Sequence, residues 1–306
     1  MRYSIIGTGG IGGYYGSRLA QHGHEVHFLL HSDYEHVKEH GLQVDSVNGS
    51  FHLDAPHIYD DARQMPLSDV VLVCLKTTNN HLLPQLLSAV ADEHTIVILI
   101  QNGIGVEDDV QHMMPHLQLV AGLAFICTAK KAPGHINHQC YGQINLGNYS
   151  CNDKDRLMLV AEDFSNANLP AHLVEYKEAR WKKAVWNMPF NGMTVALDTQ
   201  TDYLLKNPAT RQLIREQMME IARAAQGQGI MGIDEKFVEK MISMTDVMIP
   251  YSPSMKLDYD HHRPMEIDYI YTRPLRIARE AGVPMPKLEM LEAELRFIEE
   301  RQLQDR

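Results

Sequence analysis

Two patterns of apolar and polar positions follow one another along the chain, and the change from the first to the second comes near residue 176. Before that point, short apolar runs alternate with helical stretches. After it, apolar residues recur at helical spacing only. We therefore expect two domains, an α/β domain over residues 1–176 and an all-helical domain over residues 177–306.

Short apolar runs in the first part predict the strands of a largely parallel sheet. Two of them, Val70–Leu75 and Thr95–Ile100, are apolar throughout, as is typical of strands covered on both faces. Strand–helix–strand order at this spacing, with a first helix over Gly13–His22, indicates a doubly wound sheet. Further strands are expected at Tyr3–Ile6, Glu25–Leu30, Leu119–Thr128 and Gln143–Gly147, with room for an antiparallel pair at one end.

Apolar side chains in the second part fall on single faces of predicted helices. One of these helices contains Pro274, which is expected to kink it. The helices are expected at Ala209–Gln226, Asp234–Val247, Glu266–Ala281 and Lys287–Gln304.

Composition and charge narrow the class of protein. With 306 residues, 44% hydrophobic and 22% charged, the chain has the make-up of a soluble globular protein. Its net charge of −11 argues against nucleic acid as a partner, because phosphate binding needs a basic face. No apolar run reaches the roughly 18 to 20 residues of a membrane helix. The start, MRYSIIG, lacks a signal-peptide pattern, so we expect a cytoplasmic protein.

Cysteine and histidine spacing predicts neither disulfides nor a metal site. The four cysteines show no C-x-x-C pattern and no disulfide framework, and we expect small buried side chains in a reducing compartment. The pairs His135/His138 and His261/His262 have no three-ligand spacing.

A glycine-rich segment directly follows the first predicted strand and precedes the first helix. It reads Gly7-Thr8-Gly9-Gly10-Ile11-Gly12, and this context is the one that makes a G-x-G-x-x-G motif informative. The first glycine allows a tight turn, the second lets the backbone approach a pyrophosphate, and the third lets helix and strand pack closely. The helix N-terminus then offers N–H groups to the phosphates. A Rossmann domain that binds a nicotinamide cofactor is predicted, with a glycine turn that binds nothing as the alternative.

The end of the second strand bears on the choice between NADP and NAD. An acidic residue directly at this strand end would hold the ribose hydroxyls of NAD, and none stands there. His31 and Ser32 can hydrogen-bond a 2′-phosphate, which favours NADPH. Asp33, two positions further on, can reach back, so NAD is not excluded.

With the glycine motif, Lys76, Gln101-Asn102-Gly103 and Trp181–Leu197, the chain resembles the ketopantoate reductase (2-dehydropantoate 2-reductase) family over nearly its whole length. The resemblance implies a cytoplasmic oxidoreductase that reduces 2-dehydropantoate to pantoate with NADPH in pantothenate biosynthesis. It also implies that Lys76 contacts the cofactor and the substrate, and that Asn102 contacts both the nicotinamide ribose and the substrate. His31 stands where the family often has arginine.

Lys183, Asn187 and Asn191 recur every four residues and form a polar stripe on a helix whose surroundings are apolar. Buried polar groups need partners, and a substrate is one candidate. An interdomain hydrogen-bond network is the alternative. The stripe matches the family's W-x-K and N-x-x-x-N patterns, whereas Gly192 replaces the proline that usually follows the second asparagine.

A third group of residues follows near the C-terminus. The resemblance places Ser254 and Asp258 at the substrate and Glu266 in the catalytic group. Tyr271 and Thr272 depart from the asparagine-glycine that the family commonly has there, which leaves the shape of the pocket open.

Reduction of a 2-keto acid requires a positioned cation that stabilises the carbonyl oxygen and supplies its proton. We predict that Lys183 does this, because its neighbour Lys182 points about 100° away on a helix. Ser254 and the asparagines would hold the substrate, and Glu266 would orient the lysine or accept a substrate hydrogen bond. The active site is expected between the two domains.

The sequence is also consistent with two other functions. The chain could be a related NAD(P)-dependent reductase of another 2-keto acid, or a non-catalytic NADPH sensor, which the presence of Lys183 and Glu266 disfavours. A homodimer is left open, and a small 2-keto acid is the expected partner molecule.

Overall fold

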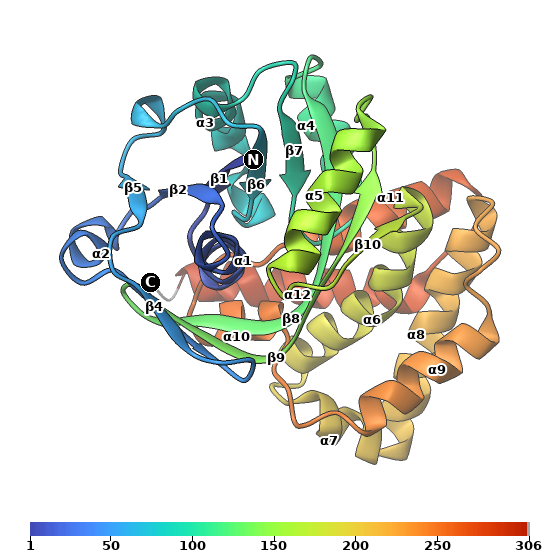
Figure 1. Cartoon of the computed structure of the whole chain (residues 1–306). Coiled ribbons are helices and arrows are strands. Elements are labelled where there is room, and N and C mark those ends of the chain that lie inside the picture. The colour runs from blue at the N-terminus through green and yellow to red at the C-terminus, as the bar shows by residue number, and fades with distance from the viewer. Residues whose placement is uncertain (305–306) are drawn as a thin grey trace. The chain divides into compact units, whose positions relative to one another are not determined.

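The computed structural model describes residues 1–304 and divides the chain into two compact units, each described here by itself. The first comprises Met1–Gln101 and Val106–Tyr176, and the second comprises Asn102–Gly105 and the chain from Lys177 onward. The first unit is α/β and the second is helical (Figure 1). This confirms the predicted fold class.

The first unit is built on a sheet of ten strands among the described residues. Its central strands lie in the order β5-β2-β1-β6-β7-β8 and are parallel, whereas β8 and β9 are antiparallel. Because β2 and β6 lie on opposite sides of β1, the switch point of the sheet lies between β1 and β6. The strands are β1 (Arg2–Ile6), β2 (Glu25–Leu29), β3 (Leu42–Ser46), β4 (Phe51–Leu53), β5 (His57–Tyr59), β6 (Val70–Val73), β7 (Ile96–Leu99), β8 (Gln118–Ala132), β9 (His135–Asn148) and β10 (Ala171–Val174).

Both faces of the parallel strands are buried. Helices α1 (Gly10–Gln21) and α5 (Lys154–Asn166) share one apolar core with residues of β1, β6 and β7. Residues of the opposite parity, such as Val71 and Val97, are also completely buried, which is why β6 and β7 are apolar throughout. The unit also contains α2 (Tyr34–His40), α3 (Leu83–Val90), α4 (Val106–Met113) and the 3₁₀ turns η1 (Ala62–Gln64) and η2 (Thr77–Leu82).

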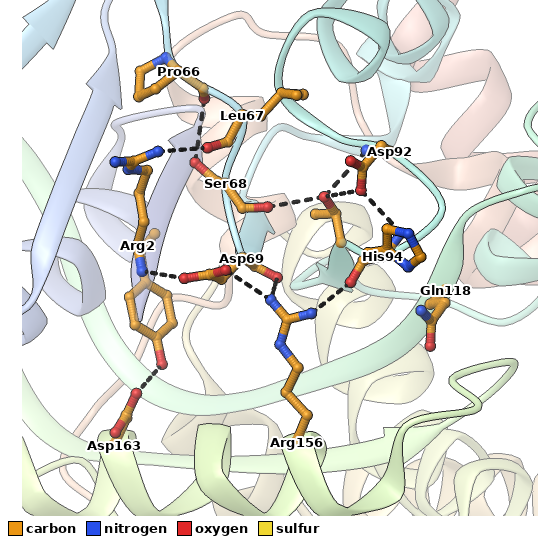
Figure 2. A network of polar contacts seen from close by, with 12 residues as sticks. Arg2, Pro66, Leu67, Ser68, Asp69, Asp92, His94, Gln118, Arg156 and Asp163 are labelled. Carbon is orange, nitrogen blue, oxygen red and sulfur yellow. Dashed lines mark hydrogen bonds and ion pairs between the residues drawn. The ribbon is translucent and has the colours of Figure 1, made fainter.

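A polar network ties helix α5 to the amino ends of the parallel strands (Figure 2). The Arg156 guanidinium donates to the carbonyl and carboxylate of Asp69 at 3.1 and 2.9 Å, and to the carbonyl of His94 at 2.7 Å. The Asp69 carboxylate also accepts from the backbone N–H of Arg2 at 2.8 Å. These contacts lie at the edge of the sheet opposite the glycine segment, so their role is structural.

Strands β8 and β9 form one long hairpin that the sequence prediction gave as two shorter strands. Cys127 and Cys140 face each other across it and are joined as a disulfide. The expectation that no cysteines pair was wrong here, because the pairing depends on the register of the hairpin and not on a recognisable spacing.

The second unit packs its helices around a single apolar cluster. Ile214, Met218 and Ile221 of α8 lie fully buried in it. Among the described residues, no helix is long and apolar enough to cross a membrane. The helices are α6 (Tyr176–Ala196), α7 (Thr201–Lys206), α8 (Pro208–Gly227), α9 (Glu235–Asp246), α10 (Ser254–Asp260), the π-helical turn η3 (Asp268–Thr272), α11 (Arg273–Glu280) and α12 (Pro286–Gln304).

The helix predicted over Glu266–Ala281 is present, but its first part is π-helical and not α-helical. The π-helical turn η3 comes first, and α11 then begins at Arg273. Pro274 lies in the first turn of α11, directly after the π-helical turn. The kink at Pro274 stays a prediction.

Candidate active site

The glycine segment forms the turn between β1 and α1. Gly7 has a φ of 99°, which a side chain would strain, and a Cβ on Gly12 would lie 2.3 Å from the Gly7 carbonyl oxygen. Helix α1 begins at Gly10, earlier than predicted, so Gly9 is its N-cap, and no side chain caps the helix. A Cβ on Gly9 would meet nothing within 4 Å. The loop therefore leaves an open cradle at a helix N-terminus, which suits a pyrophosphate.

A cavity of about 940 Å³ lies along this cradle, at the switch point of the sheet. Its volume is at the upper end of the roughly 300 to 1,000 Å³ usual for ligand pockets. Gly7, Thr8 and Gly9 line it, whereas Gly10 packs against Ala129 of β8 and Ile11 against the apolar core. From elsewhere in the unit the lining includes Leu29, His31, Ser32, Asp33, Arg63, Lys76 and Lys130. These groups fit a dinucleotide.

Lys76 and Asn102 follow successive strands but fall in different units. Lys76 precedes η2 and lines the nucleotide cavity. Asn102 begins the short segment that clusters with the helical unit. The following residue, Gly103, has a φ of 100° and approaches Tyr269 of η3 so closely that a Cβ would lie 2.4 Å from its carbonyl oxygen. The turn thus holds Asn102 beside a residue that lines the cavity of Lys183.

Lys183 lines a second, small cavity of about 10 Å³ in the helical unit, room for about one water. Arg180 and Asn187 of α6 line it as well. The pKa of Lys183 is lowered to about 7, mainly by burial and also by the charge of Arg180, whereas Glu266 acts in the opposite direction. The remaining lining comes from Gly103, Ile104, Ala184, Met188, Ile270 and Pro274.

The two adjacent lysines of α6 have different surroundings. Lys182 forms an ion pair with Glu178, one turn earlier, at 2.8 Å, and its side chain is 41% exposed. Lys183 faces the cavity and has the strongly lowered pKa. A lysine that is half protonated near neutral pH can both stabilise a negative oxygen and give up a proton, which an exposed lysine does poorly.

Asn191 does not line the Lys183 cavity in the described structure. Its amide nitrogen donates to the Asn187 carbonyl at 2.8 Å, and its amide oxygen accepts from the Met255 N–H at 3.0 Å. The side chain is 2% exposed. Asn191 therefore fixes the first turn of α10, which begins at Ser254.

Ser254, Asp258 and Glu266 lie at three places in the helical unit. Ser254 is half-buried as the first residue of α10. Asp258 is buried, and its carboxylate accepts from Arg263 Nε at 3.0 Å. Glu266 is 3% exposed just before η3 and is the anion that acts on the pKa of Lys183. Of the three, only Glu266 has a described interaction with a residue of the cavity.

The histidines of the predicted pairs have other surroundings. His135 Nε2 lies 2.7 Å from Asp45, and the buried His138 contacts the Ser46 hydroxyl at 2.8 Å. Across residues 1–304, no group of three or more His, Cys, Asp or Glu side chains is arranged to hold a metal ion.

Comparison with known proteins identifies the family of the chain. The model "Ketopantoate reductase PanE/ApbA" matches residues 3–150, and the model of that family's C-terminal part matches residues 175–299. The chain belongs to the ketopantoate reductase family. A 2-dehydropantoate 2-reductase of Nostoc sp. is 42% identical over 98% of this chain and 96% of its own length.

Solved structures agree with this family membership. A 2-dehydropantoate 2-reductase of Geobacter metallireducens superposes with a TM-score of 0.93 at 35% identity, over 97% of this chain and 99% of the other. A D-mandelate dehydrogenase solved with NADH and anilino(oxo)acetate has a TM-score of 0.90 at 24% identity, over 99% of each chain. At that identity the second likeness shows the fold alone.

Two of the departures from the ketopantoate reductase pattern, Gly192 and Tyr271, lie against each other. The fully buried Tyr271 hydroxyl donates to the Met188 carbonyl, and a Cβ on Gly192 would lie 2.5 Å from that hydroxyl. Burial raises the pKa of Tyr271 far above its ordinary value, so the hydroxyl stays protonated. Thr272, a further departure, is exposed and hydrogen-bonds Glu292. Only Tyr271 therefore bears on the cavity, through Met188.

Two cations at these cavities were missed in the sequence. Arg180 is 3% exposed and stands three residues before Lys183, so the i, i+3 spacing could have revealed it. Lys130 lines the nucleotide cavity and pairs with Asp33, 97 residues away. No sequence pattern signals that pairing, because it arises from the β8–β9 hairpin.

Proposed function

We propose that this protein reduces 2-dehydropantoate to pantoate with NADPH, the reductase step of pantothenate biosynthesis. Its family membership and the name of its 42% identical relative support this reaction. The observation that carries the proposal is Lys183, a cavity-lining cation whose pKa is lowered to about 7.

Lys183 acts as the acid of the reduction. Protonated, it stabilises the charge that grows on the carbonyl oxygen and then gives that oxygen a proton. With a pKa of about 7, a large share of the lysine is protonated at neutral pH, and the proton is also easily released. Bound NADPH supplies the hydride to the carbonyl carbon.

The other predicted residues bind and orient. Asn187 lines the Lys183 cavity and donates to the substrate, together with Asn102 and Ser254. Glu266 keeps Lys183 protonatable, since its charge raises the pKa of the lysine. Asn191 and Asp258 hold α10 in place through Met255 and Arg263, and their direct contacts with substrate rest on the family resemblance.

The cofactor-binding residues are those along the larger cavity. Gly7, Thr8 and Gly9 form the cradle for the pyrophosphate, and Gly10 and Ile11 begin the helix whose N–H groups face it. Gly12 permits the close packing of the loop, and Lys76 contacts the cofactor from the end of β6. NADPH is favoured over NADH because His31 and Ser32 line the end of the cavity at β2.

Replacing Lys183 by methionine tests the catalytic assignment. We expect kcat with 2-dehydropantoate and NADPH to fall by about a hundredfold or more, as for loss of one electrostatic donor. The NADPH dissociation constant should change little, because Lys183 lies outside the nucleotide cavity. Lys182→Met, in the exposed neighbour, is the matched control. Near-normal turnover of Lys183→Met contradicts the assignment.

Reduction of another 2-keto acid is the second candidate. It is favoured by Tyr271, which departs from the family pattern and packs on Met188 of the Lys183 cavity. Comparing kcat/KM for a panel of 2-keto acids separates the two. If 2-dehydropantoate is not the best substrate of the panel, the second candidate replaces the first. Absence of turnover with every acid would indicate a non-catalytic NADPH-binding protein.

A further inference from the structure

Asp33 is the acidic side chain nearest in sequence to the end of β2, where a carboxylate selects NAD by binding its ribose. All of its hydrogen-bonding capacity is used within the protein. Lys130 Nζ lies 2.8 and 3.0 Å from its two oxygens, Ser32 Oγ donates at 2.9 Å and the Gly134 N–H at 3.2 Å. A carboxylate accepts about four such bonds, so Asp33 has none left for ribose hydroxyls.

The Asp33–Lys130 ion pair is held firmly. The Asp33 side chain is 6% exposed. Burial alone favours its neutral form, but the bonds from Lys130, Gly134 and Ser32 outweigh this and lower the pKa of Asp33. The carboxylate is therefore charged, and it fixes the end of the lysine side chain.

Lys130 presents a cation to the nucleotide cavity. It lies on β8, its side chain is 36% exposed, and it lines the cavity together with His31 and Ser32. An ammonium has three N–H donors, and two are directed at Asp33. Within residues 1–304 the third has no described acceptor.

We propose that Lys130, positioned by Asp33, binds the 2′-phosphate of NADPH and, beside His31 and Ser32, is the cation that distinguishes NADPH from NADH in this protein. The inference rests on the proposed function, which supplies NADPH as the cofactor. A phosphate monoester carries a charge of about −1.5 to −2 at neutral pH and accepts strong hydrogen bonds from an ammonium. Asp33 is a positioning residue here and not a ribose ligand.

Arg63 is the competing cation of the same cavity. It donates three hydrogen bonds to Asp61, and its side chain is 79% exposed. Water around so exposed a guanidinium screens its charge, so Arg63 is expected to contribute less to binding than Lys130. Arg63→Met therefore tests the competing cation.

The experiment measures dissociation constants of NADPH, NADH, 2′,5′-ADP and 5′-AMP by calorimetry, without turnover. For Lys130→Met we expect NADPH and 2′,5′-ADP to bind about tenfold or more weakly, as for loss of a charge-assisted contact. NADH and 5′-AMP should bind as before or more tightly, because Asp33 is then released toward the ribose. Arg63→Met should weaken the binding of NADPH and 2′,5′-ADP less than Lys130→Met does, and the opposite order would assign the 2′-phosphate to Arg63.

The outcomes distinguish failure of the proposed use of NADPH from failure of the proposed role of Lys130. If the unaltered protein binds NADPH no more tightly than NADH, the NADPH assignment and the role of Lys130 both fail. If it prefers NADPH and Lys130→Met keeps that preference, only the role of Lys130 fails. A uniform loss for all four ligands would mean that Lys130 is merely structural. For Asp33→Asn we expect unchanged NADH affinity, and a selective loss of NADH binding would assign Asp33 to the ribose instead.

Discussion

The pKa of Lys183 is set by two neighbours of opposite charge, and removing each should move the pH dependence of the reaction in opposite directions. Arg180 lowers this pKa and Glu266 raises it, while burial is the largest influence. Reduction requires protonated Lys183. The kcat/KM for reduction should therefore be constant below about pH 7 and fall about tenfold per pH unit above it.

The size of the shift follows from the spacing on helix α6. Residues three apart on a helix, such as Arg180 and Lys183, have Cβ atoms about 5 to 6 Å apart, and for two such long side chains we use a charge separation of about 8 Å. At an effective dielectric constant of about 20 their repulsion is about 2 kcal/mol, or about 1.5 pH units. For Arg180→Met we expect the break in the profile to move up by about one unit, after allowance for relaxation.

Glu266→Gln should move the break downward, by less than Arg180→Met moves it upward, because Glu266 has the smaller influence on this pKa. The assay is kcat/KM for reduction from about pH 5.5 to 9.5, which reports the free enzyme. Arg180→Lys keeps the charge and should leave the break in place, as should Lys182→Met. If both charge-removing variants shift the break in the same direction, or neither shifts it, Lys183 is not the titrating acid.

Two further variants test contacts within each unit, Gly192→Ala in the helical unit and Arg156→Ala in the α/β unit. Gly192→Ala should destabilise the protein by about 1 to 3 kcal/mol, since the new methyl would lie 2.5 Å from the Tyr271 hydroxyl, and Tyr271→Phe should restore part of the loss in a thermal melt. An unchanged melting temperature for Gly192→Ala would show that the contact is easily relieved. Arg156→Ala should cost about 1 to 2 kcal/mol in denaturant unfolding through its lost bonds to Asp69 and His94, with kcat unaltered; a large loss of kcat would contradict a purely structural network.

Features that depend on neighbouring residues were predictable from the sequence. The glycine turn, the fully apolar strands β6 and β7, and the α8 helix all follow from local conformation or from periodicity over a single element. The separation of Lys182 from Lys183 is of the same kind, because the angle between adjacent helical residues is fixed.

Features that depend on pairing between distant segments were not predictable. The disulfide of Cys127 with Cys140 and the ion pair of Lys130 with Asp33 both depend on the β8–β9 hairpin, whose polar half alternates too weakly to be recognised as strand. The π-helical turn η3 just before Pro274 was not predicted either, because the pattern over Glu266–Ala281 is helical throughout.

Gly192 of α6 and Tyr271 of η3 are best understood as one coupled change and not two. A proline at position 192, as the family resemblance implies, would remove the N–H that bonds the carbonyl of Met188, four residues earlier. In this chain that carbonyl accepts from the Tyr271 hydroxyl, with the Gly192 backbone as a second partner of the hydroxyl. Only glycine leaves room for the phenol at this point. The Tyr271 hydroxyl thus bonds the carbonyl that a proline at position 192 would leave without its helical N–H partner. Met188 still lines the cavity of Lys183, although Gly192 and Tyr271 both depart from the family pattern.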